Sequence, residues 1–323
     1  MPSSRQVISE FIQRGYIQPK HINEALTLSQ VSPNKQSWFK FIDRLLLSLG
    51  ALALGFSVLF FIAFNWNEFG RFAKFALLEA AVVITISFYF YSAKNSLGRQ
   101  ISLMLASLMV GVLMAFFGQT YQTGADPWTL FFYWAILITP WVVIARFAPL
   151  WLSWLVLLNV ALSLYIDTFS SPLALLFDYQ QELFLALFVL NSCALIALEL
   201  NSKRFEYLSS RWVARLIATF CGFMISIALF ENIISSQDLN ITSTLFWVGF
   251  ISALYVGYRH KRKDLFMLAG GCLSGITIIS TSIIIWAENG LDEGLLLLIA
   301  FIIIGLTSLS TIWLKKVHKE MSQ

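Results

Sequence analysis

Long apolar stretches alternate with short polar connections over most of the chain. Each apolar stretch runs for about 20 residues, the length that a helix with a rise of 1.5 Å per residue needs to cross a hydrocarbon layer of about 30 Å. The hydrophobicity is continuous rather than alternating, which predicts helices and not the strands of a barrel. We therefore expect an all-α polytopic transmembrane helical bundle of about 10 spans, at residues 45–66, 72–92, 101–118, 128–145, 149–167, 182–200, 212–230, 242–258, 265–286 and 294–314.

The composition supports a lipid environment. Apolar residues make up 58% of the chain and charged residues only 12%, whereas about a quarter of the residues in soluble proteins are charged. This balance excludes an ordinary water-soluble globular protein and makes the lipid bilayer the first expected partner.

Basic residues are concentrated on one side of the predicted spans. Except for Arg71, Lys74 and Arg215, the 22 lysines and arginines fall in the segments 1–44, 93–100, 146–148, 201–211, 259–264 and 315–323. The positive-inside rule then predicts that both termini are cytoplasmic. Arg215, one turn inside a span, can snorkel to the headgroups. The net charge of +4 is thus an insertion signal, and we expect no nucleic acid partner.

The spans suggest three regions: a cytoplasmic amphipathic helical segment at 1–44, a first transmembrane half at 45–167, and a second half at 168–323 that ends in a short basic cytoplasmic tail. Five spans in each half would make the second half insert upside down, as in the inverted repeats of many secondary transporters. The halves share no similarity beyond composition, so this 5+5 inverted repeat is a hypothesis.

The N-terminal segment predicts two short amphipathic helices. Val7, Ile8, Phe11 and Ile12 recur at helical spacing, and Gly15 suits a C-terminal cap. The two helices could dock on the membrane face, on a cytoplasmic protein partner through residues 5–28, or on each other's apolar stripe. We favour the last of these three arrangements.

Three residues with a carboxyl or amide side chain fall well inside predicted spans, where polar groups are costly and usually face the bundle interior. Asn159 and Asn191 lie near the centres of their spans, and an interhelical hydrogen bond explains both. Glu79 is ionisable, so it could be neutral, paired with a cation such as Lys74, or a proton carrier.

Two polar segments lie where the first and third spans leave the bilayer on the outer side. They supply amides, a phenol, indoles and a carboxylate that could line a shared substrate pocket. The alternative is an interfacial aromatic belt with capped turns, because tryptophans settle at this depth and Asp126 before Pro127 suits a helix start. The candidate substrate-binding residues are Asn65, Trp66, Asn67, Gln119, Tyr121, Gln122, Asp126 and Trp128.

The same segments carry a family resemblance. The Gly15-Tyr16-Ile17 turn, the first span that ends in Asn65-Trp66, and the stretch from Gln119 to Trp128 resemble the bacterial predicted membrane proteins called domain of unknown function 2157. The resemblance covers about residues 1–145. It implies a multi-pass protein of the bacterial inner (plasma) membrane with no established activity.

No motif of a known reaction appears. The chain has no Gly-x-x-x-x-Gly-Lys phosphate loop, no Gly-x-Ser-x-Gly turn and no His-Glu-x-x-His helix. Cys193, Cys221 and Cys272 lie inside spans without metal-ligand spacing, and the three histidines are far apart. We therefore assign no catalytic residue, metal site or cofactor, and we lean against an enzyme.

Three functions remain open. The leading one is transport or sensing of a small solute through the outward-facing polar site. The alternative is a structural or scaffolding membrane component that recruits a cytoplasmic partner through its N-terminal helices, and a membrane-embedded transferase comes third. A transporter predicts a cavity that reaches Glu79, Asn159 or Asn191, whereas a scaffold predicts that these groups are packed and hydrogen-bonded.

Overall fold

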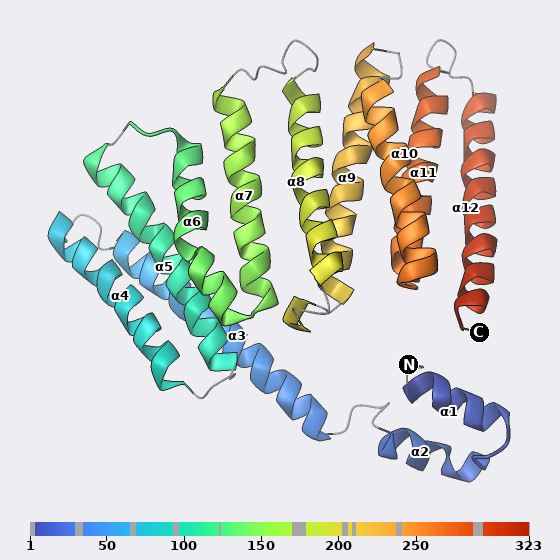
Figure 1. Cartoon of the computed structure of the whole chain (residues 1–323), viewed down its shortest axis with the longest axis horizontal. Helices are drawn as coiled ribbons and strands as arrows, with labels where there is room; N and C mark the ends of the chain where they lie inside the picture. Colours follow the sequence, from blue (N-terminus) through green and yellow to red (C-terminus); the bar gives the residue numbers. More distant parts are fainter. Residues whose placement is uncertain are drawn as a thin grey trace. The chain divides into compact units, whose positions relative to one another are not determined.

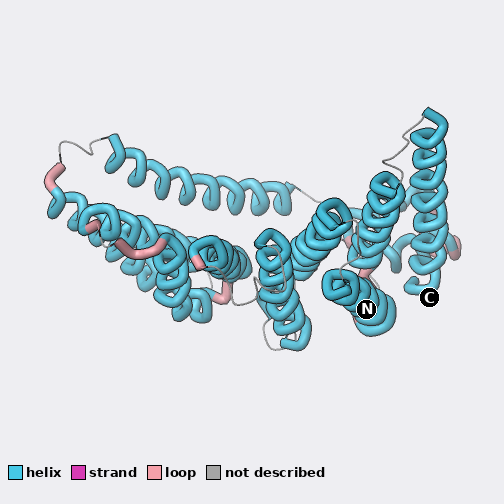
Figure 2. The backbone as a smooth tube through the Cα atoms, turned by 90° about the horizontal axis from the view of Figure 1, so that it is seen from above, coloured by secondary structure: helices cyan, strands magenta, loops and turns pink. Residues whose placement is uncertain are grey.

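Helices are the only regular elements in the part of the chain that the structure describes. This computed structural model describes residues 4–29, 35–64, 69–92, 97–122, 124–169, 179–201, 206–208, 211–236, 241–286 and 293–322. All of its regular elements are helical, as Figure 1 and Figure 2 show. The all-α prediction is therefore confirmed.

Within these residues, nine helices are long and apolar enough to cross a membrane. They are α4 (Arg71–Tyr91), α5 (Leu97–Tyr121), α6 (Pro127–Ala145), α7 (Ala148–Thr168), α8 (Tyr179–Asn201), α9 (Arg211–Ser236), α10 (Ile241–Val256) with the π-helical turn η4 (Gly257–Lys261), α11 (Leu265–Trp286) and α12 (Glu293–Ser322). The span predicted at 45–66 overlaps a further helix, α3 (Lys35–Phe64). A polytopic bundle of about ten spans is thus confirmed, although α12 continues beyond its predicted end at residue 314.

The chain divides into two compact units, Met1–Thr120 and Tyr121–Gln323. The boundary that we predict between residues 167 and 168 and the inverted repeat stay predictions.

The N-terminal unit begins with α1 (Ser4–Gln13), η1 (Pro19–His21) and α2 (Ile22–Leu28). Gly15 has φ +75° and its N–H donates to the Ile12 carbonyl (3.1 Å), while the Tyr16 N–H donates to the Phe11 carbonyl (3.0 Å). These two bonds form a Schellman cap, whose usual hydrophobic contact is the edge-on pair of Phe11 and Tyr16 rings. The predicted glycine cap is confirmed. α1 and α2 contact each other, and Ile8 is buried.

Helices α3, α4 and α5 of this unit meet through small and aromatic residues. Leu78 of α4 is 1% exposed, and Phe75 packs on Phe116 of α5 with 4.5 Å between ring centroids. α3 approaches α5 at Gly55, where an added Cβ would lie 3.2 Å from Leu105 Cδ2. A close approach at a small residue is how membrane helices gain packing without a hydrophobic driving force.

The C-terminal unit is organised around α9, which contacts α8, α10 and α11. Figure 1 shows this helix between α8 and α10. Its residues Val213, Ile217, Cys221 and Ile225 recur every fourth position and are at most 1% exposed. A helix whose side chains are buried at this spacing presents a continuous packed face to its neighbours. Trp154 of α7 adds a bond to α6, because its Nε1 donates to Thr139 Oγ1 (3.0 Å).

The contact at Gly55 gives a stability prediction. Gly55→Leu should lower the free energy of unfolding by about 1–3 kcal/mol, because the new side chain must displace Leu105. Gly50→Leu, on the same helix and with nothing within 4 Å of its added Cβ, should change it by much less. Thermal unfolding of both variants in detergent measures the difference, and equal midpoints would contradict the close approach.

Candidate functional site

The outer candidate residues lie in different surroundings. Asn65, Trp66 and Asn67 lie outside the described residues. Gln119 and Tyr121 are exposed in the last turn of α5, and Gln122, which follows it, is exposed with φ +43°. Their assignment as a substrate site stays a prediction.

Asp126 and Trp128 belong to the start of α6. The exposed Asp126 occupies the N-cap position, and its backbone carbonyl accepts bonds from the N–H and hydroxyl of Thr129 (3.0 and 2.6 Å). Trp128 packs edge-on against Tyr165 and Phe169, with ring centroids 5.1 and 6.2 Å away. These contacts are of the kind that the belt-and-cap alternative predicts.

Glu79 differs from the usual orientation of an intramembrane carboxyl. On α4, Lys74 and Leu78 are buried while Glu79 is exposed. The helical spacing puts Glu79 on the same side as the exposed Phe72, Ala76 and Val83. Glu79 thus lies on an exposed face of α4, and its role as a neutral, paired or proton-carrying group stays a prediction.

Asn159 and Asn191 meet between α7 and α8. Asn191 Nδ2 donates to Asn159 Oδ1 (2.5 Å), and Asn159 Nδ2 donates back to Asn191 Oδ1 (3.3 Å). Each Nδ2 also donates to a carbonyl one turn earlier in its own helix, Leu155 or Leu187, at 2.8 Å. The interhelical hydrogen bond that the sequence predicts is present, and it uses the N–H groups of both amides.

Two further polar clusters, which sequence reasoning missed, tie α9 to its neighbours. Ser243 Oγ of α10 accepts from Gln181 Nε2 of α8 (3.0 Å) and from Asn232 Nδ2 of α9 (3.1 Å). Ser274 Oγ of α11 lies 2.7 Å from Ser226 Oγ of α9 and accepts from Trp247 Nε1 of α10 (2.8 Å). Small hydroxyls leave little hydropathy signal, so only the three-dimensional arrangement identifies these partners.

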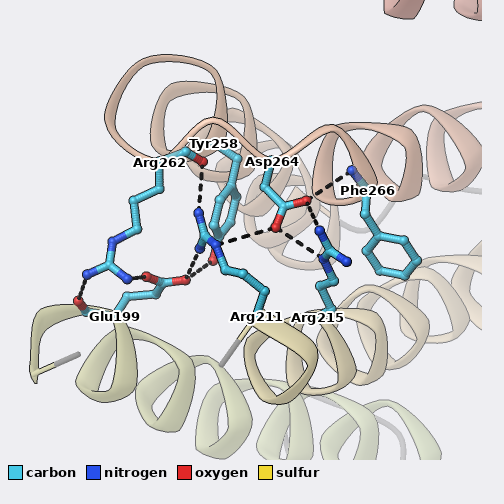
Figure 3. A network of polar contacts seen from close by, with 7 residues as sticks. All are labelled: Glu199, Arg211, Arg215, Tyr258, Arg262, Asp264 and Phe266. Carbon is cyan, nitrogen blue, oxygen red and sulfur yellow. Dashed lines mark hydrogen bonds and ion pairs between the residues drawn. The ribbon is translucent and has the colours of Figure 1, made fainter. Parts of the chain in front are cut away.

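The most highly charged cluster lies at the end of the C-terminal unit where α9 and α11 begin. We call it the basic-end network, and Figure 3 shows its members. They are Glu199 of α8, Arg211 and Arg215 of α9, Tyr258 of η4, and Arg262 and Asp264 of the connection to α11.

Asp264 is the most buried charge of the network, with a side chain 1% exposed. Its Oδ1 accepts the backbone N–H of Phe266 (3.1 Å), which is an N-cap bond to the first turn of α11. Arg215 donates to both carboxylate oxygens at 3.1 Å in a bidentate pair, and Arg211 Nε lies 3.7 Å from Oδ2. The carboxylate therefore fixes the start of α11 to α9.

Glu199 links the other half of the network. Its Oε1 accepts from Tyr258 Oη (2.8 Å) and from Arg211 Nη1 (3.5 Å), and its Oε2 lies 2.6 Å from Arg262 Nη1. Arg262 also donates to the backbone carbonyl of Glu199 (2.8 Å). Three guanidinium groups thus face two carboxylates, and the network carries a surplus positive charge.

Sequence reasoning missed this network, although it placed Arg215 near the headgroups. The available signal was Asp264, an acidic residue that directly follows a basic run and precedes a span. Its partner Arg215 lies 49 positions earlier in the sequence, and a contact between residues so far apart cannot be inferred from local spacing.

The family comparison covers the N-terminal part of the chain. Residues 9–151 match the model of a family described as predicted membrane protein, DUF2157. The match confirms the resemblance that the sequence suggests, and it supports a multi-span protein in a lipid bilayer. The DUF2157 match includes the stretch from Gln119 to Trp128, but it ends before Asn159 and the basic-end network. Comparisons with curated proteins and with solved structures found no match.

The cap and ion pair at Asp264 give a second stability prediction. Asp264→Ala should reduce the free energy of unfolding by about 2–3 kcal/mol, because it removes the N-cap and leaves two arginines without this carboxylate. Glu320→Ala breaks the more exposed pair with Arg259 and should cost less than about 1 kcal/mol. Unfolding in detergent compares the two, and a loss at Glu320 as large as at Asp264 would refute the anchoring role.

Proposed function

We propose that the protein is a non-enzymatic membrane scaffold that recruits a cytoplasmic protein through its N-terminal helices. The observation that carries this proposal is the hydrogen-bonded Asn159–Asn191 pair. A packed scaffold predicts that these amides bond to each other, whereas a transporter predicts that a cavity reaches them. Residence in a bacterial inner membrane with both termini inside is part of the proposal.

The amide pair supports a packed bundle at this level. A solute site near the bilayer midplane needs donors and acceptors that are free to replace the water of the solute. In α7 and α8 the N–H groups donate to the partner amide and to the helix backbone, and Asn191 is 3% exposed. With these bonds made, the amides stabilise the contact between two helices, and few of their donors and acceptors remain for a solute.

The N-terminal helices support recruitment of a partner. Although Ile8 is buried where α1 meets α2, Phe11, Tyr16 and Leu28 are 46%, 73% and 80% exposed. Large apolar side chains that remain exposed beside a rigid helix cap suit an apolar surface of a second protein. Glu10 of α1 and Arg14, which directly follows this helix, form an exposed ion pair that provides a polar rim.

Transport or sensing of a small solute through the outer segment is the competing function. It would use Gln119, Tyr121, Gln122 and Asp126, which are exposed. Solute access to the bundle interior distinguishes the two functions.

Cysteine labelling tests for that access. Ser163→Cys, one turn from Asn159 on α7, should resist membrane-impermeant thiol reagents applied from either side, because the proposed packed bundle leaves no water-filled path to this position. The background replaces Cys193, Cys221 and Cys272 with alanine, and Lys261→Cys in the exposed basic turn serves as the labelled control. Rapid labelling at position 163 that a solute slows would support transport and overturn the scaffold.

Photo-crosslinking in cells tests recruitment. A crosslinking residue at position 16 or 28 of the full chain should give one discrete protein adduct, and Phe11→Glu should reduce it at least fivefold because a charge enters the apolar surface. The same crosslinker at Tyr133, exposed on the membrane helix α6, should not give that adduct. Immunoblotting measures the adducts, and their absence from both N-terminal positions would refute the proposal.

A further inference from the structure

We propose that an anionic phospholipid binds along α9, α10 and α11, with an acyl chain in a groove between these helices and its phosphate at the basic-end network. The charge distribution puts this end on the cytoplasmic side, so the lipid would belong to the inner leaflet. The site lies within the C-terminal unit and does not depend on the scaffold proposal.

The groove has the size and lining of an acyl-chain site. Its volume is about 590 Å³, with Phe250, Ile251 and Leu254 of α10 among its lining residues. Pockets for small-molecule ligands are about 300–1,000 Å³ in volume.

The polar groups that line the groove are already bonded. Ser226 and Ser274 lie 2.7 Å apart and share a hydrogen bond. Thr219 and Thr277 donate to carbonyls one turn earlier in their own helices, at 2.8 and 3.0 Å. With these hydroxyls satisfied, the groove presents an apolar surface and its best occupant is a hydrocarbon.

Glycines leave part of the groove lining without side chains. Gly222, Gly270 and Gly271 are among the lining residues. A Cβ added at Gly270 would meet no atom within 4 Å, so the space in front of this residue is open. A large side chain at this position could therefore enter the groove without displacing the backbone.

The length of the groove matches one leaflet. Its lining runs from Ala218 to Phe230 on α9 and from Phe266 to Ile278 on α11, which is about 18 Å along each helix at 1.5 Å per residue. Half of a hydrocarbon layer of about 30 Å is about 15 Å. An acyl chain that enters beside Phe266 can thus extend to the middle of the bilayer.

The basic-end network lies where the headgroup would be. The Arg215 guanidinium lies 5.4 Å from the centroid of the Phe266 ring, and Phe266 lines the groove. The Arg215 side chain is 42% exposed. The exposed Lys261 and Lys263, which lie just before α11, add positive charge at this end of the unit. Asp264 accepts from Nε and Nη2 of Arg215, so a phosphate would be attracted by the surplus positive charge of this end, as basic side chains at this depth attract anionic lipids.

Photoreactive lipids test the site on the purified full chain in nanodiscs. A phosphatidylglycerol probe with a diazirine in its acyl chain should crosslink mainly to residues 218–230 and 266–278, as mapped by peptide mass spectrometry. Gly270→Leu fills the groove and should reduce these adducts at least fivefold. Gly249→Leu, equally open on α10 but outside the groove lining, should reduce them less than twofold.

Competition with unlabelled lipid tests the headgroup. Phosphatidylglycerol should protect the groove better than phosphatidylcholine, and high salt should weaken this preference. Adducts spread evenly over all membrane helices, or unchanged by Gly270→Leu, would overturn the groove as a lipid site. Equal protection by the two lipids would overturn the role of the basic end, and protein–protein adducts at the groove would identify a second copy as its occupant instead.

Discussion

Hydrocarbon offers no water to a polar group, and this constraint accounts for most polar contacts in the described helices. Hydroxyls inside the spans turn back to carbonyls of their own helix, as Ser107 does to Leu103 and Thr139 to Ala135. Amides have more polar groups than one backbone bond can satisfy, so Asn159 and Asn191 bond both to their own helix and across helices. Which helices neighbour each other thus follows in part from which polar groups need a partner.

Charged groups follow the same constraint at a different depth. Asp264 is almost fully buried, yet it accepts bonds from Arg215 and the start of α11, while the arginines keep contact with the interface. Removing the Asp264 carboxylate would leave Arg211 and Arg215 without this partner in a poorly hydrated place. The apolar face of α9 holds its neighbouring helices through dispersion and close packing. The charged end holds the same helices through hydrogen bonds and ion pairs.

The spans could be predicted because helix length and hydropathy depend on the bilayer alone, not on neighbouring helices. The cap at Gly15 was equally local, since only glycine adopts its positive φ without strain. The Asn159–Asn191 bond was predictable because both residues were placed at span centres. The exposure of Glu79 was not predictable, because α4 is apolar on most sides and its sequence does not indicate which face packs. The basic-end network and the groove depend on contacts between distant segments, which spacing does not encode.

The ion pair of Arg215 and Asp264 joins residues 49 positions apart in the chain. A ribosome makes Arg215 before it makes the carboxylate that pairs with it, so α9 is complete before this ion pair can form. A chain that stops before Asp264 therefore leaves Arg215 without its bidentate partner and lacks the helix that Asp264 caps.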